Sequence, residues 1–231
     1  MYPCIEAVFS DLDGTLVDSE EPLRNSWVEV IAECGHDFSR FNYLDIIGAP
    51  ESEKVGIVLA FFGIKEDSQE FYRRLIAKMR ERLPREMKLM PGAERFLEAC
   101  VGTGAPRGLI TSATQWHADL ALDLFNLRRF FHPKCIITAE TPGLEARKPS
   151  PAPYVMGAQR LRVKPSRCVV FEDSPHGVQA GVSAGMSVVA IPHALSPRSV
   201  LEAINRSVYV LPEGQNIGDF EFDHIEHLLP Q

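Results

Sequence analysis

The 231-residue sequence has no hydrophobic run long enough to cross a lipid bilayer. Its longest apolar-rich stretch, residues 55–64, is shorter than the roughly 18 residues that a membrane-spanning helix needs. The N-terminus also lacks the basic region, long apolar stretch and cleavage site of a signal peptide, because Met1-Tyr2-Pro3 leads directly into a strand-like run. We therefore expect a cytoplasmic protein that does not bind membranes.

Cysteine and positive charge are also scarce. The five cysteines are odd in number and widely spaced, which suggests neither a disulfide framework nor a zinc knuckle and agrees with a reducing compartment. The 24 Lys and Arg residues against 31 Asp and Glu residues give a formal net charge of -7, with no concentrated basic patch. Such a surface repels nucleic acids and anionic lipids. We expect a small-molecule partner and a monomer or weak dimer.

The sequence does contain a regular alternation of short apolar runs and helical patterns. Strand-like runs lie at 4–10, 107–111, 134–138, 168–172 and 187–191. Helical patterns lie between or after them at 93–101, 116–125, 152–161 and 178–184. Strands that alternate with helices predict an α/β fold, a doubly wound, Rossmann-like parallel sheet with helices on both faces.

The segment from about residue 20 to residue 87 interrupts this alternation. It contains no convincing strand but has two apolar stripes at helical spacing, each with charged residues on the opposite face. The stripes consist of Trp27, Val30, Ile31 and Cys34, and of Phe71, Leu75, Met79 and Leu83. We predict an inserted α-helical domain at 17–87 in a core built from 1–16 and 88–231.

Four polar clusters lie at the ends of predicted strands or just ahead of a helix. They are Asp11-Leu12-Asp13-Gly14-Thr15, Thr111-Ser112, Lys148-Pro149 and Glu172-Asp173-Ser174-Pro175. In an open parallel sheet, ligands bind beyond the carboxyl ends of the strands. The four clusters are therefore the candidate site.

The clusters together favour phosphoryl transfer. A carboxylate nucleophile cannot approach a phosphate dianion unless cations neutralise both, so a hard divalent ion is implied. Mg²⁺ prefers a few carboxylate or carbonyl oxygens, which Asp11, the backbone carbonyl of Asp13 and Asp173 can supply. Lys148 adds a second positive charge. Thr111 and the backbone N–H of Ser112 can hold phosphoryl oxygens without adding charge.

In order and setting, the four clusters resemble the four motifs of the haloacid dehalogenase-like hydrolases, and the resemblance covers the whole chain. The helical insert resembles the cap of the subgroup that contains β-phosphoglucomutase, phosphoglycolate phosphatase and small sugar-phosphate phosphatases. The resemblance implies an aspartyl-phosphate mechanism. Asp11 would be the nucleophile, and Asp13 the general acid for the leaving alcohol and then the base for water. Lys148 would anchor charge, Asp173 would bind the metal, and Glu172 would lie beside it.

Within that family, the second carboxylate distinguishes phosphatases from dehalogenases, because an alkoxide needs a proton donor and a halide does not. Asp13 therefore favours phosphate ester cleavage. By ungapped spacing, Leu23 and Glu51 occupy the positions where β-phosphoglucomutase carries a histidine and an arginine. We predict a Mg²⁺-dependent phosphatase of a small phosphorylated metabolite, such as a sugar phosphate. A phosphomutase and a non-catalytic phospho-ligand sensor remain the alternatives.

Overall fold

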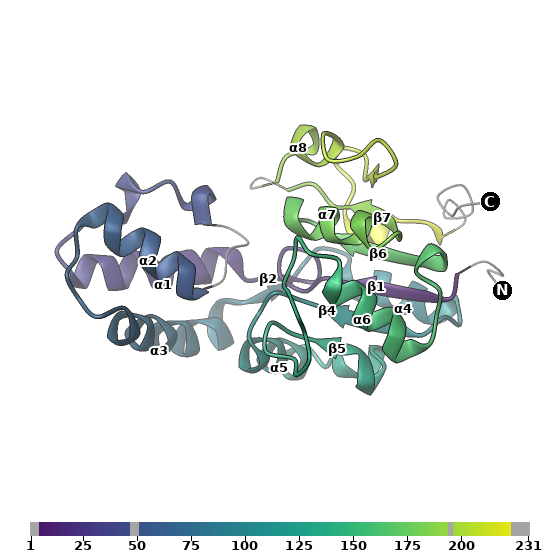
Figure 1. The fold of residues 1–231 in the computed structure, drawn as a ribbon, viewed down its shortest axis with the longest axis horizontal. Coiled ribbons are helices and arrows are strands. Elements are labelled where there is room, and N and C mark those ends of the chain that lie inside the picture. The colour runs from purple at the N-terminus through teal and green to yellow at the C-terminus, as the bar shows by residue number, and fades with distance from the viewer. Residues whose placement is uncertain (1–4, 47–50, 194–195, 223–231) are drawn as a thin grey trace. The chain divides into compact units, whose positions relative to one another are not determined.

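The computed structural model describes residues 5–46, 51–193 and 196–222 (Figure 1). The contacts divide the chain into two compact units, Met1–Asp18 with Leu89–Gln231, and Ser19–Lys88. The sequence placed the corresponding boundaries at 16/17 and 87/88. No described helix is long and apolar enough to span a membrane.

The larger unit is built on a parallel β-sheet. Its strands are β1 (Ala7–Ser10), β4 (Arg107–Ile110), β5 (Ile136–Ile137), β6 (Cys168–Glu172), β7 (Ser187–Ala190) and β8 (Tyr209–Val210). Their order in the sheet is β5-β4-β1-β6-β7-β8, and every neighbouring pair is parallel. The chain therefore starts in the centre, builds one side and returns to build the other. This reversal on either side of β1 creates the switch point at which ligands bind in such sheets.

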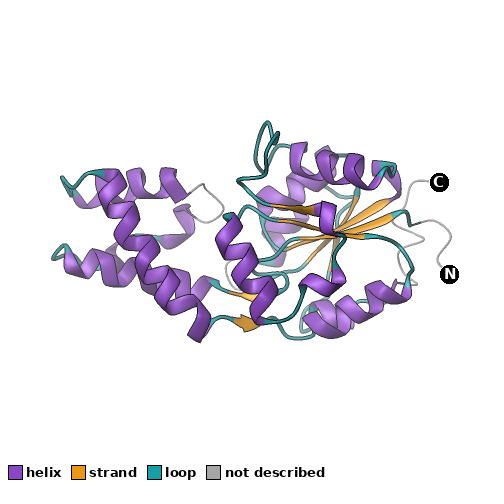
Figure 2. Ribbon diagram, turned by 90° about the horizontal axis from the view of Figure 1, so that it is seen from below, coloured by secondary structure: helices purple, strands orange, loops and turns teal. Residues whose placement is uncertain are grey.

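Helices cover both faces of this sheet, as Figure 2 shows. They are α4 (Ala93–Gly102), α5 (Gln115–Leu124), α6 (Ala152–Leu161), α7 (Pro175–Ser183) and α8 (Arg198–Glu202). On one face, Phe9 and Val170 share a buried cluster with Tyr154 of α6 and Val178 of α7. Side chains alternate along a strand, so Phe171 faces the opposite way. The centroid of its ring lies 4.5 Å from the ring centroid of Phe96 in α4.

The predicted α/β fold with a doubly wound parallel sheet is confirmed. The short elements β8 and α8 were not predicted, because segments of two and five residues carry almost no periodic signal. The run at 134–138 contributes only the two residues of β5, since a 3₁₀ turn at Pro133–Cys135 precedes them. Helix α6 begins at Ala152, with Pro151 at the position before it.

The smaller unit is helical. It contains α1 (Glu20–Glu33), α2 (Glu51–Phe62) and α3 (Ser68–Glu86), together with the 3₁₀ turns Phe38–Arg40 and Tyr43–Ile46. Seven of the eight residues in the two predicted apolar stripes are buried, and only Cys34 is partly exposed. The aromatic members pack closely, with the Trp27 and Phe71 ring centroids 5.9 Å apart. A two-stranded sheet of β2 (Val17–Asp18) and β3 (Lys88–Leu89) lies where the chain passes between the units.

Candidate active site

Three adjacent strands of the sheet end in the candidate residues. Asp11 follows β1, Thr111 follows β4, and Glu172 is the last residue of β6 with Asp173 next. Strands β4, β1 and β6 are neighbours in this order. Since they are parallel, their carboxyl ends meet at one edge of the sheet. Residues from three of the four motifs are thus brought together by the order of the strands.

Lys148 reaches this edge from the segment ahead of α6. Its Nζ donates to Asp11 Oδ1 and Glu172 Oε1, both at 2.5 Å, and to the carbonyl oxygen of Ile110 at 2.7 Å. A lysine ammonium has three N–H donors, so all of them are used. The Lys148 side chain is only 4% exposed. A charge buried to this degree needs such partners, because its hydration is lost. The neighbouring carboxylates accordingly raise the pKa of Lys148 against the opposing effect of burial.

Glu172 is fully buried and bonded through both carboxylate oxygens. Oε1 accepts from Lys148 and from the hydroxyl of Tyr154, the latter at 2.8 Å. Oε2 accepts from the backbone N–H of Asp173 and from the hydroxyl of Ser174. Burial, followed by the charge of Glu172, raises the pKa of Tyr154 well above its usual value, so the phenol keeps its proton and donates. Glu172 therefore orients Lys148 and the turn after β6.

Asp173 lies between two further side chains. Its Oδ1 accepts from the hydroxyl of Thr15 at 3.1 Å, and its Oδ2 lies 2.9 Å from Nε2 of His193. Burial raises the pKa of Asp173, and the hydrogen bond to His193 opposes that effect. Gly14 lies against the same carboxylate, since a Cβ at Gly14 would be 2.1 Å from Oδ2. Its φ of +77° also favours glycine, so the turn after β1 requires glycine for two separate reasons.

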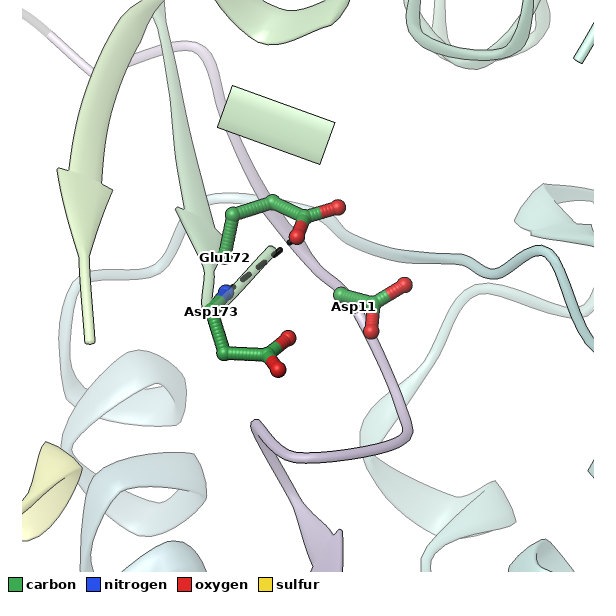
Figure 3. A group of neighbouring side chains, drawn as sticks. All are labelled: Asp11, Glu172 and Asp173. Atoms are coloured by element: carbon green, nitrogen blue, oxygen red, sulfur yellow. Dashed lines mark hydrogen bonds between the residues drawn. The ribbon is translucent and has the colours of Figure 1, made fainter. Parts of the chain in front are cut away.

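The carboxylates of Asp11, Glu172 and Asp173 converge, as Figure 3 shows. One oxygen from each lies within 4.8 Å of the others. Burial is the largest influence on Asp11 and raises its pKa well above the usual value, while Lys148 opposes that shift. Three buried carboxylates beside one ammonium leave negative charge to be neutralised. An all-oxygen donor set of this kind fits a hard divalent cation such as Mg²⁺.

Asp13 lies two residues after Asp11, in the turn that follows β1. Its Oδ1 is 3.0 Å from Nε2 of His117, which is in the first turn of α5. The His117 side chain is 8% exposed and that of Asp13 is 20% exposed. Asp13 is thus the more accessible of the two and lies beside a buried imidazole.

The two predicted phosphate-binding residues after β4 differ in burial. Thr111 is buried, and its Oγ1 accepts from the backbone N–H of Ala113 at 3.0 Å, which leaves its own hydrogen to donate. Ser112 is exposed. The hydrogen bond between Thr111 and Ala113 closes a tight turn that presents Ser112 to solvent, where a phosphate could reach its backbone N–H.

Sequence reasoning missed three side chains of the site, namely His117, Tyr154 and His193. Each lies outside the four motifs, and none has a sequence neighbour that reveals its partner. His176, which adjoins the fourth motif, is exposed in the first turn of α7. Of the two positions compared with the mutase, Leu23 is buried, and the side chain of Glu51 lies outside the described part of the structure.

Comparisons with known proteins agree with these features. The family model described as haloacid dehalogenase-like hydrolase matches residues 8–191, which is more than half of the chain. The phosphorylated carbohydrates phosphatase of Thermotoga maritima is 29% identical over 210 residues, covering 90% of this chain and 95% of the relative. Hexitol phosphatase B of Escherichia coli is 30% identical over 212 residues, covering 88% and 92%.

A solved structure provides a further likeness. A crystal structure from Thermotoga maritima, provisionally assigned as a β-phosphoglucomutase, superimposes with a TM-score of 0.76 at 26% identity. The match covers 97% of this chain and 100% of that one. The relatives therefore include named phosphatases as well as a structure linked to a mutase.

Proposed function

The chain belongs to the haloacid dehalogenase-like hydrolase family, and from this we propose that it is a Mg²⁺-dependent phosphatase of a small phosphorylated carbohydrate. The observation that carries the proposal is the contact of Lys148 with Asp11 at the centre of the sheet edge. The ammonium binds Oδ1 and leaves Oδ2 of Asp11 to attack phosphorus. A nucleophile held in one orientation in this way avoids much of the entropic cost of the reaction.

In the proposed reaction, Oδ2 of Asp11 forms a bond to phosphorus while the bond from phosphorus to the leaving alcohol oxygen breaks. Asp13 donates a proton to that oxygen, which leaves as the neutral alcohol. Asp13 then accepts a proton from water as the water oxygen attacks the aspartyl phosphate. The bond from phosphorus to Asp11 breaks, and inorganic phosphate is released with both carboxyl groups restored.

Thr111, Ser112 and Lys148 are the proposed phosphate-binding residues. Thr111 has a hydroxyl hydrogen to donate, Ser112 is exposed, and Lys148 adds positive charge beside Asp11. The proposed metal ligands are Asp11, Asp173 and the backbone carbonyl of Asp13, with Glu172 beside them. When bound, Mg²⁺ supplies the positive charge that lets a carboxylate approach a phosphate dianion.

The substrate class is inferred from the relatives, two of which are named as phosphatases of phosphorylated carbohydrates and of hexitol phosphate. The purified protein should be assayed for phosphate release with and without Mg²⁺. A suitable panel contains glucitol 6-phosphate, fructose 1-phosphate, glycerol 3-phosphate, phosphoglycolate and nucleoside monophosphates, ranked by kcat/KM. We expect Mg²⁺-dependent release, greatest from a carbohydrate phosphate. No release from any compound would favour a non-catalytic sensor.

The mutase alternative needs a separate assay. The protein is given β-glucose 1-phosphate, catalytic β-glucose 1,6-bisphosphate and Mg²⁺, and glucose 6-phosphate and free phosphate are followed separately. A mutase must protect its phosphoenzyme from water until a sugar phosphate accepts the group, and it needs cations for the distal phosphate. We expect free phosphate to predominate. Sustained glucose 6-phosphate formation with little free phosphate would overturn the phosphatase proposal.

A further inference from the structure

Tyr154 contacts both members of the buried pair of Lys148 and Glu172. Its hydroxyl donates to Oε1 of Glu172 at 2.8 Å, and the same oxygen accepts from Nζ of Lys148 at 2.5 Å. Nζ also lies over the Tyr154 ring, 5.2 Å from its centroid. This distance is within the roughly 6 Å at which an ammonium is attracted to an aromatic face. One side chain therefore holds the carboxylate through its hydroxyl and the cation through its ring.

We propose that Tyr154 is a positioning residue that keeps the ammonium of Lys148 directed at Asp11 and at the phosphoryl group. The ammonium divides its three N–H donors among three acceptors, which belong to Asp11, Glu172 and Ile110. Within the described part of the chain, Lys148 and Tyr154 are the two donors to Oε1 of Glu172. Without the hydroxyl, that oxygen would depend on Lys148 alone and would draw the ammonium away from Asp11. This inference rests on the proposed function, in which Lys148 binds the phosphoryl group.

Burial makes the Tyr154 hydroxyl hard to replace. Tyr154 and Glu172 are fully buried, and the side chain of Lys148 is only 4% exposed. In such surroundings a hydrogen bond to a charged group is stronger than in water, and bulk water cannot take the place of a lost donor. The position of the ammonium therefore depends on how the side chains around it share their hydrogen bonds.

The helix that carries Tyr154 is itself fixed against the sheet. Tyr154 lies in the first turn of α6, six residues after Lys148. One turn further along, a Cβ at Gly157 would lie 3.0 Å from Cε1 of Phe9 and 3.1 Å from Cδ1 of Ile110. The α6 backbone therefore lies close against β1 and β4, two of the strands that end at the site. The tyrosine thus reaches the pair of Lys148 and its carboxylate from a helix with little room to shift, as a positioning group requires.

The test removes the hydroxyl and keeps the ring. For Tyr154→Phe, we expect the KM of the fastest substrate of the panel and the inhibition constant of vanadate to rise about three- to tenfold. The physical reason is that an ammonium drawn toward Glu172 neutralises the phosphoryl group less well. Tyr209→Phe is the matched control and should change neither constant, because Tyr209 lies in β8, which is separated from β6 by β7. Urea unfolding of each variant measures stability separately.

The outcomes separate this inference from the proposed function. If Tyr154→Phe is less stable but keeps the wild-type KM and vanadate inhibition constant, Tyr154 has a structural role and the positioning role is overturned. A fall in kcat with both constants unchanged overturns it as well. A wild-type protein that releases no phosphate contradicts the phosphatase proposal instead. Calorimetric titration with inorganic phosphate then compares the two proteins, and equal affinities overturn the inference. If circular dichroism shows that Tyr154→Phe is unfolded, Tyr154→Met, which also lacks a donor, takes its place with the same expected result.

Discussion

The Cα of Gly177 in α7 lies directly against the carboxylate of Glu172. A Cβ at position 177 would be 1.8 Å from Oε1 of Glu172, well inside van der Waals contact. That oxygen accepts from both Lys148 and Tyr154. The first turn of α7 therefore needs a residue without a side chain so that Glu172 can hold Lys148 in place.

We predict that Gly177→Ala disrupts the site by displacing Glu172. Displacement breaks the contacts to Lys148 and Tyr154, so kcat/KM should fall at least about tenfold, and the free energy of unfolding should fall by about 1–3 kcal/mol. Gly56→Ala is the control, because it lies within α2 with no atom near the added Cβ. Steady-state kinetics and urea unfolding measure both effects. Wild-type activity in Gly177→Ala would show that catalysis does not depend on the observed position of Glu172.

The nucleophile can be tested by Asp11→Asn. The change removes the attacking oxygen and one buried negative charge, so turnover should be abolished while the circular dichroism spectrum stays native. Burial already raises the pKa of Asp11, which means that the neutral amide suits this place in the fold. Retention of more than about a hundredth of the wild-type kcat, a barrier increase under about 2.7 kcal/mol, would count against covalent catalysis by this residue.

Lys148→Ala should weaken phosphate binding, turnover and stability together. The variant leaves Asp11 and Glu172 as buried carboxylates without their shared cation, which costs about 3–5 kcal/mol of folding free energy. The KM should rise, and the affinities for inorganic phosphate and vanadate should fall. Arg147→Ala, at the exposed preceding residue, is the matched control. Unchanged KM and inhibitor affinity in Lys148→Ala would remove Lys148 from the phosphate site.

Ion pairs between α1 and α3 should make stability depend on pH. Arg74 contacts Glu33 and Glu66, each at 2.7 Å, and its hydrogen bond is the main cause that lowers the pKa of Glu33. The pKa of Glu33 is lower in the folded state than its unfolded value of 4.5. The charged carboxylate therefore stabilises the fold at pH values above 4.5, and this stabilisation is lost as the pH falls through the folded-state pKa.

We therefore expect Arg74→Met to lower the free energy of unfolding by up to about 1 kcal/mol at pH 7, or Tm by about 2–4 °C. The difference from wild type should shrink as the pH falls below 4.5. Arg85→Met is the control, because Arg85 and Glu81 form an exposed, longer contact of 3.5 Å. Thermal unfolding of the full chain at several pH values measures the difference. If the stability difference between wild type and Arg74→Met grew as the pH fell, the ion pairs of Arg74 would not be its cause.

Local patterns in the sequence were sufficient to predict a doubly wound parallel sheet. Continuous apolar runs such as 168–172 identify strands buried on both faces, and the polar residues after them identify the edge where ligands bind. The stripes at Trp27 and Phe71 likewise predict packed helices, because helical periodicity is a property of neighbouring residues. Predictions failed for elements too short to carry a period, such as β8.

The sequence by itself thus determined the fold class, the family resemblance and the candidates Asp11, Asp13, Lys148 and Asp173. Only the tertiary structure decided how their side chains pair. Lys148 meets Asp11 across 137 positions of the chain, and His117 of α5 lies beside Asp13 in the turn after β1. Such contacts depend on the order of the strands and the rotation of each helix on the sheet. No periodicity within a segment encodes these contacts. Only the folded structure shows that His117 lies in the site and that His176 faces solvent.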